Sequence, residues 1–287
     1  MWFALALGAA LAQAGQLTVV KARARHLHPF VIMLWTQMIG LAVWSAVTWL
    51  AGASFAAPWR LAGWVIAAVV VAAAMNYLLA RASAGGDLSI VAPILAVAPI
   101  VSVVPDWAFT GTLPRGIGWV GVMVTVLGAV TLGRGDTRRF DLRSLLTRED
   151  ALCAFGAAAA FGLLSAIDRR VTIDAGVPGY LAAIYVCQVP LTALLLRVRQ
   201  PRALAAARGW PDVTTLVAHA VVATASIAMQ LTVVTLAPVA YVNSVRQLST
   251  VFTVVIGRLL FDEPGLGRRL AGAVLIGAGA AILLFAR

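Results

Sequence analysis

The chain has 287 residues, of which 62% are hydrophobic and 11% charged, and its mean hydropathy is +0.94. Soluble domains carry about 25% charged residues, so this composition excludes a soluble enzyme, a disordered chain and a secreted disulfide scaffold. The formal net charge of +11 comes from 22 Lys and Arg against 11 Asp and Glu, and the basic residues lie between apolar runs. We therefore expect a polytopic membrane protein whose partner is the lipid bilayer and not a nucleic acid.

Apolar runs of roughly 17–25 residues, the length that crosses the hydrocarbon of a bilayer, recur ten times. They are long and continuous, unlike the alternating strands of a membrane barrel, so the predicted fold class is all-α. In chain order the runs are 2–20, 29–51, 60–80, 89–110, 116–133, 151–167, 179–196, 213–235, 238–260 and 267–286.

The basic connection 134–150 divides these runs five and five, which predicts one repeat at 1–133 and a second at 151–287. A shift of 151 residues pairs Gly121 with Gly272 and Gly128 with Gly279. Because five is odd, the second repeat would enter the membrane from the opposite side, which gives two inverted repeats. Such an architecture places a substrate site near the midplane, between the repeats.

Orientation is predicted from the distribution of positive charge. Sixteen of the 22 Lys and Arg lie in or beside the odd-numbered connections, those after runs one, three, five, seven and nine. The positive-inside rule then places both termini outside the cytoplasm.

Polar and aromatic side chains within the runs predict a polar, aromatic-lined cavity. Each of them either contacts a ligand or ties two helices together, and rings could hold an apolar or cationic part of a substrate by stacking. The candidates in runs one, two, three and seven are Gln13, Gln16, Trp35, Gln37, Asn76, Tyr185 and Gln188, and Tyr241 in run nine is a further ring.

The fourth run contains Pro93, Pro99 and Pro105, and each proline removes a backbone donor and clashes with the preceding turn. A bend is expected there, which is either a hinge between the repeats or a static kink. His219 in run eight is either a titratable relay or a histidine satisfied by a neighbouring group.

Arg246 is the most informative residue, because an arginine near the middle of a spanning helix must find partners or face a wet cavity. Helical spacing places Asn243, Gln247, Thr250 and Thr253 on the same face. This polar stripe predicts a substrate-binding wall or gate, and the alternative is a structural donor to backbone carbonyls.

Acidic residues are missing from the middle of every predicted run, since Asp106, Asp168, Asp262 and Glu263 all fall near run ends. Arg246 thus lacks an evident carboxylate partner at its own depth. A carboxylate or phosphate on the cargo would serve as counter-ion. The same absence disfavours proton coupling through a buried carboxylate.

The stretch 236–284 contains the acidic turn Phe261-Asp262-Glu263, followed by a Gly-rich helix with Gly272, Gly277 and Gly279 on its close-packing face. It resembles the closing helices of the EamA-like branch of the drug/metabolite transporter superfamily. The resemblance implies a ten-helix, multi-pass carrier in a bacterial-type inner membrane, often an exporter of small metabolites by alternating access. It also implies cytoplasmic termini, so orientation stays open.

Glu263 itself is either a helix-terminal residue pairing with Arg268 or Arg269, or a gate latch. Two other functions compete with a small-molecule carrier: a flippase for lipid-linked or sugar-phosphate cargo, and a non-transporting scaffold. An enzyme is not expected, because paired acids and hydrolase motifs are missing from the sequence. No metal site or cofactor is expected either, and small residues along runs five and ten would serve a homodimer or internal packing equally well.

Overall fold

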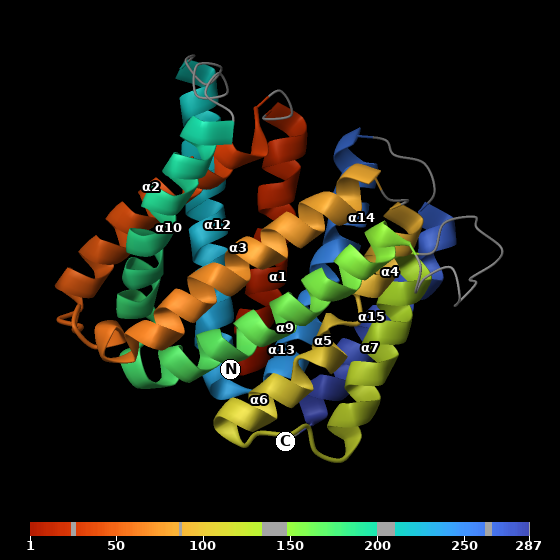
Figure 1. Cartoon of the computed structure of the whole chain (residues 1–287). Helices are drawn as coiled ribbons and strands as arrows, with labels where there is room; N and C mark the ends of the chain where they lie inside the picture. The colour runs from red at the N-terminus through yellow and green to blue at the C-terminus, as the bar shows by residue number, and fades with distance from the viewer. Residues whose placement is uncertain (24–26, 86–87, 134–147, 200–209, 262–265, 287) are drawn as a thin grey trace.

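The computed structural model describes the chain except for residues 24–26, 86–87, 134–147, 200–209, 262–265 and 287 (Figure 1). Every regular element in the described part is helical, as the composition predicts. In chain order the elements are α1 (Trp2–Arg23), α2 (Pro29–Leu50), the 3-10 helix η1 (Pro58–Leu61), α3 (Ala62–Gly85), α4 (Leu88–Leu95), α5 (Ala98–Val101), α6 (Val103–Thr110), α7 (Ile117–Gly133), α9 (Glu149–Ala175), α10 (Val177–Arg199), α12 (Trp210–Leu236), α13 (Val239–Arg246), α14 (Leu248–Phe261) and α15 (Leu266–Phe285).

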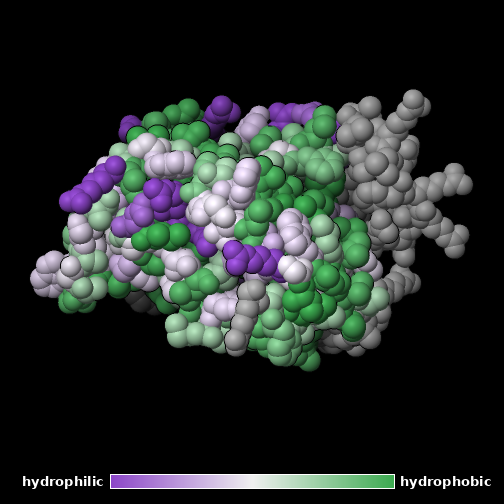
Figure 2. Space-filling view, turned by 90° about the horizontal axis from the view of Figure 1, so that it is seen from below, coloured by the Kyte–Doolittle hydropathy of each residue, from purple (hydrophilic) through white to green (hydrophobic). Residues whose placement is uncertain are grey.

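Eight helical stretches are long and apolar enough to cross a membrane. The two remaining predicted runs form shorter apolar helices, Ile117–Leu132 and Ala271–Phe285. Large apolar side chains stand on the surface, with Leu50, Leu259 and Phe285 each at least 75% exposed. Figure 2 shows hydrophobic residues across much of one face. The chain is thus built as a multi-pass membrane protein, and ten crossings remain a prediction.

The fourth run is broken at its prolines into α4, α5 and α6. Pro93 lies inside α4, and Pro99 stands in the first turn of α5. Between the two helices the backbone forms tight turns, in which Val97 N–H donates to Ile94 O at 3.1 Å and Ile100 N–H to Val97 O at 2.9 Å. The regular α-helix is therefore interrupted within this span.

The ninth run is broken as well, although it contains no proline at the break. Its two parts, α13 and α14, meet at Gln247. Gln247 N–H donates to Ser244 O, and Thr250 N–H to Gln247 O, both at 3.0 Å, so the α-helical pattern gives way to three-residue turns. The prediction of one continuous helix over 238–260 is wrong at this point, and the break lies directly beside Arg246.

The sixth run extends further than its hydropathy predicts. The expected end at residue 167 is wrong, because α9 continues to Ala175 and carries Asp168, Arg169 and Arg170 within one helix. These charges are tolerated because they are paired: Arg169 with Asp106, and Arg170 with Asp174. A charged residue ends an apolar run in the sequence but does not end a helix whose charges find partners.

The most extensive helix pairs each join a helix from before residue 134 to one from after residue 147. They are α1 with α12, α2 with α10, α3 with α9, and α7 with α15. The two parts of the chain are therefore interleaved.

Glycines bring α7 and α15 close together. A Cβ on Gly272 would lie 2.6 Å from Leu132 N, and one on Gly128 would lie 2.8 Å from Gly272 O. Gly279 faces Gly121 in the same way, so the residues matched by the 151-residue shift pack crosswise. Gly277 has no atom within 4 Å of a built Cβ, so its predicted place on the close-packing face is wrong. These glycines therefore serve packing within the chain, which is one of the two roles predicted for the small residues of runs five and ten.

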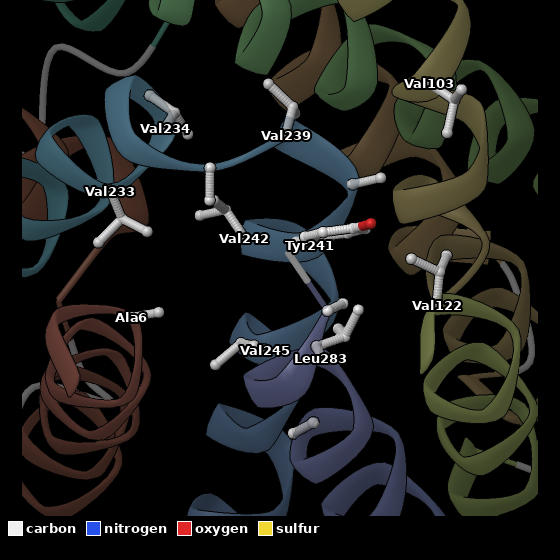
Figure 3. Close-up of a cluster of buried hydrophobic side chains, with 14 residues drawn as sticks. Ala6, Val103, Val122, Val233, Val234, Val239, Tyr241, Val242, Val245 and Leu283 are labelled. Atoms are coloured by element: carbon white, nitrogen blue, oxygen red, sulfur yellow. The ribbon is translucent and has the colours of Figure 1, made fainter. Parts of the chain in front are cut away.

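Apolar packing fixes the position of α13. Val239, Val242 and Val245 are buried against Val233 of α12 and Leu283 of α15. Figure 3 shows these side chains between α1, with Ala6, and α7, with Val122. Asn243 and Arg246 of the same helix line the cavities described below.

The two ends of the described chain lie on one side of the bundle. Trp2, Thr112, Pro238 and Ala286 line the same cavity of about 350 Å³, and we call this end the terminal side. The start of α2 and the end of α10 at Arg199 lie at the opposite end (Figure 1), which we call the basic side.

Candidate functional site

Arg246 ends α13 and is held by one partner from each part of the chain. Its Nε donates to Gln13 Oε1 of α1 at 2.6 Å. Its guanidinium carbon lies 4.9 Å from the centre of the Phe161 ring of α9. A charge-assisted hydrogen bond and a cation–π contact together fix the side chain. Gln13 is its only hydrogen-bond partner in the described part of the chain, so its terminal amino groups are left for a ligand or water.

Two cavities meet at Arg246. The first, about 210 Å³, is lined by Asp168, and we call it the Asp168 cavity. The second, about 370 Å³, is lined by Asn243, and we call it the Asn243 cavity. Arg246 and Phe161 line both, so the arginine is reached from either chamber.

A third and larger cavity adjoins the first. It measures about 520 Å³, lies between α2, α3 and α10, and extends to His28 and Arg199 on the basic side. Ala72 and Gln188 line both this cavity, which we call the vestibule, and the Asp168 cavity. The three cavities thus follow one another from the basic side to Arg246 and Asn243.

Asp168 supplies an acid in the same cavity as Arg246, which corrects the prediction that no carboxylate lies at that depth. Asp168 Oδ1 accepts a hydrogen bond from the Tyr180 hydroxyl at 2.6 Å. Asp168 and Arg246 interact electrostatically, but among the described residues no direct ion pair joins them. The gap between opposite charges leaves room for a ligand that bears both.

Six buried side-chain polar atoms have no hydrogen-bond partner in the described residues, and three of them belong to cavity-lining residues: Gln37 Oε1, Tyr185 Oη and Asn243 Oδ1. Their side chains belong to residues that are 6%, 3% and 2% exposed. They line the vestibule, the Asp168 cavity and the Asn243 cavity respectively. Unpaired buried polar groups are rare and costly, so their placement on three adjoining cavities is typical of a binding site.

A buried ion pair closes the terminal side of α13. Arg169 Nη1 lies 2.9 and 2.8 Å from the two carboxylate oxygens of Asp106, and these residues are 8% and 2% exposed. Asp106 Oδ2 also accepts the N–H of Val239 at 3.0 Å, where a carboxylate is favourable at a helix N-terminus. Asp106 therefore ties α6, α9 and α13 together. The sequence signal for it was a carboxylate within the apolar fourth run and an arginine two residues past the end of the sixth.

The predicted site residues divide into those that the structure brings to the cavities and those that it does not. Gln13, Asn243, Arg246, Gln247 and Thr250 line the Asn243 cavity, Tyr185 and Gln188 line the Asp168 cavity, and Gln37 and Asn76 line the vestibule. Phe161, which sequence reasoning missed, supplies the ring beside the arginine.

Four predicted side chains point elsewhere. Tyr241 lies on the terminal side, where its hydroxyl accepts the N–H of Arg115 at 3.0 Å. Trp35 packs in apolar clusters with Leu196 and Ile32. Gln16 lines none of the cavities described above, and Thr253 donates back to its own helix. The expected stacking of cargo on Trp35 and Tyr241 has no support in their positions.

The residues predicted to act in gating do not lie together in one site. Pro99 lines the Asn243 cavity and Pro93 lies within α4. His219 Nδ1 lies 3.2 Å from the Thr36 hydroxyl of α2, a side-chain contact that ties α12 to α2. Glu263 lies outside the described residues.

Comparison with known proteins agrees with this fold. A solved structure titled only "Crystal structure of protein" superposes with a TM-score of 0.72 at 18% identity, covering 100% of this chain and 98% of that one. No curated protein matches the chain. Residues 1–134 match the EamA-like transporter family. This match agrees with the family resemblance predicted from the closing helices of the chain.

Proposed function

We propose that the protein is a secondary transporter, an exporter or exchanger, that moves a small amphipathic metabolite by alternating access. The observation that carries this proposal is the guanidinium group of Arg246, held from one side by Gln13 and Phe161 and facing two cavities from the other. An arginine fixed in this way is a ready partner for a carboxylate or phosphate.

The carboxylate of Asp168, the second charged group in the site, limits which chemical groups the cargo would carry. Asp168 faces Arg246 across a cavity of about 210 Å³ whose other walls include Leu181 and Ile227. A head group with an anionic part toward Arg246 and a hydrogen-bond donor or cationic part toward Asp168 would satisfy both. The apolar walls would bind the carbon skeleton.

The arrangement of the helices supports alternating access. Helices from the two parts of the chain are paired across the bundle, as inverted repeats around a central axis would be. Both ends of the described chain lie on one side, which fits an even number of crossings. The vestibule leads from the basic side, whereas the Asp106–Arg169 pair ties helices together toward the terminal side. We propose that release to the terminal side requires α13 to separate from α6 and α9.

The alternatives make different demands on the same cavities. A scaffold needs no adjoining cavities with unpaired polar atoms, so their presence favours a carrier over it. A flippase needs a lateral opening toward lipid, and the exposed Tyr77 at the edge of the vestibule is the feature that favours it. Transport of a lipid-linked cargo in vesicles, without transport of soluble compounds, would identify a flippase.

The test measures the thermal stability of the purified protein with small carboxylates, phosphates, amines and amino carboxylates. Binding to the native state raises the unfolding free energy by roughly 2.7 kcal/mol at one hundred times Kd. We expect anion-bearing compounds to raise the Tm of the parent, and R246Q to lose this response while remaining folded. R170Q is the matched control, because Arg170 belongs to an ion pair on α9 that is about 40% exposed and lines none of the three cavities.

Two results would contradict the proposal. If R246Q responds as the parent does, or if amines alone raise the Tm, Arg246 is a structural donor and not a counter-ion for cargo.

A further inference from the structure

The vestibule is larger than the chamber that holds the charges, and part of its wall is apolar. Its walls include Phe30 and Met33 of α2, Val69 of α3, and Leu191 and Leu195 of α10. At about 520 Å³ it has more than twice the volume of the Asp168 cavity. Pockets for drug-sized ligands measure about 300–1,000 Å³. The Asp168 cavity alone is below that range, so it holds a head group but not a larger molecule.

Where the vestibule meets the Asp168 cavity, one wall carries a small side chain and the other carries polar amides. Ala72 of α3 is 8% exposed and lines both cavities. Opposite it, Gln37 Nε2 donates to Gln188 Oε1 at 3.5 Å, a long contact, and Gln37 Oε1 has no hydrogen-bond partner in the described residues. An alanine at this point leaves space that a larger side chain would fill. The weakly paired amides can rearrange around a molecule that passes between the cavities.

From these features we infer that the cargo is elongated, with its charged head between Arg246 and Asp168 and an apolar tail that passes Ala72 into the vestibule. This inference rests on the proposed function for the head-group site. It adds the class of substrate, an amphiphile with a single flexible chain, and a residue, Ala72, that sets how long that chain can be.

The experiment measures affinity against tail length. The probes are straight-chain 2-amino carboxylates with three, five, six and eight carbons, and Kd is obtained from the thermal stabilisation of the whole, purified chain. Burial of one methylene favours binding roughly fourfold. We expect affinity to rise by about that factor per added carbon until the vestibule is filled.

Two variants on α3 test the route of the tail. A72L places a larger side chain where the two cavities meet, and we expect it to keep the affinity for the three-carbon probe while losing the gain with length. A74L is the matched control, because Ala74 is exposed on the same helix and lines none of the three cavities. The three-carbon probe also reports whether A72L is folded, and A72V is a smaller change with the same expected direction.

The outcomes separate this inference from the proposed function. Equal affinity for all lengths in the parent, with R246Q still losing its response, overturns the elongated cargo and leaves the carrier in place. A gain with length that A72L and A74L preserve equally also overturns it, because the tail then binds elsewhere. Failure of all charged probes at every length overturns the head-group site and with it the proposed function.

Discussion

At the scale of single residues, the site depends on how Arg246 is oriented. Its partner Gln13 lies on α1, more than two hundred residues away in the sequence, and accepts its Nε–H at 2.6 Å. A neutral amide oriented in this way stabilises the guanidinium group without neutralising its charge. The arginine therefore keeps its positive charge for a ligand.

Gln13→Ala is expected to weaken anion binding about tenfold, because a hydrogen bond to a charged group contributes about 1.5–3 kcal/mol. The measurement is Kd from thermal stabilisation with the carboxylate that binds best to the parent. Gln16→Ala is the control, three residues further along α1 and outside the cavities described above. Equal losses in the two variants would show that α1 as a whole, and not its contact with Arg246, supports the site.

The sequence predicted correctly which residues of one helix face lie together. It did not predict which residues from different helices meet. Asn243, Arg246, Gln247 and Thr250 share a cavity as their spacing indicates. Tyr241 is on a different face of α13 and packs on the terminal side. Asp168 was missed because a charged residue marks the end of an apolar run in the sequence. Its hydrogen bond from Tyr180 and its place in the same cavity as Arg246 become visible only in three dimensions.

At the scale of elements, hydropathy located the helices but not their interruptions. Lipid requires long apolar helices, so composition alone marks the spans. The break of the fourth run follows from its prolines. The break at Gln247 has no such local cause and depends on the surrounding helices. The burial of Arg169 within α9 likewise depends on Asp106, a residue from another helix.

The glycines of α15 give an element-scale prediction. Gly272→Ala would place a methyl group 2.6 Å from the backbone of Leu132 and should lower the Tm by forcing α7 and α15 apart. Gly277→Ala meets nothing within 4 Å and should raise stability by about 0.5–1 kcal/mol, because alanine is the better helix former. Both are measured by thermal unfolding in the same detergent. An equal drop of the Tm in both variants would show that the contact between α7 and α15 does not determine the loss of stability.

At the scale of the whole molecule, the two parts of the chain hold each other in place through Asp106. Its carboxylate bonds Arg169 of α9 and the N-terminus of α13, so one residue from the first part orders two helices of the second. The division into two five-run parts at the connection 134–150 stays a prediction. Which helix pairs with which was not predicted, because span lengths and hydropathy carry no information on partners.

Asp106→Asn should lower the unfolding free energy by about 3–5 kcal/mol, because it leaves a buried guanidinium group without a counter-charge. Asp174→Asn is the control, since it removes an ion pair that is about 40% exposed and should cost at most about 1 kcal/mol. Thermal unfolding compares both with the double variant D106N/R169Q, which should be less destabilised than the sum of its two single changes. Additive losses in the double variant would exclude a coupled pair.

The buried pair also bears on how the protein is made. A ribosome delivers Asp106 to the membrane before Arg169 and Val239 exist, so for that interval the carboxylate has neither counter-ion nor helix to cap. Insertion of α6 must therefore be provisional, with the acid held near the lipid headgroups until α9 arrives. The order of synthesis therefore delays the full burial of Asp106. Its carboxylate gains both partners only after α13 has left the ribosome. A nascent chain stalled before that point should be a preferred target for membrane quality-control proteases.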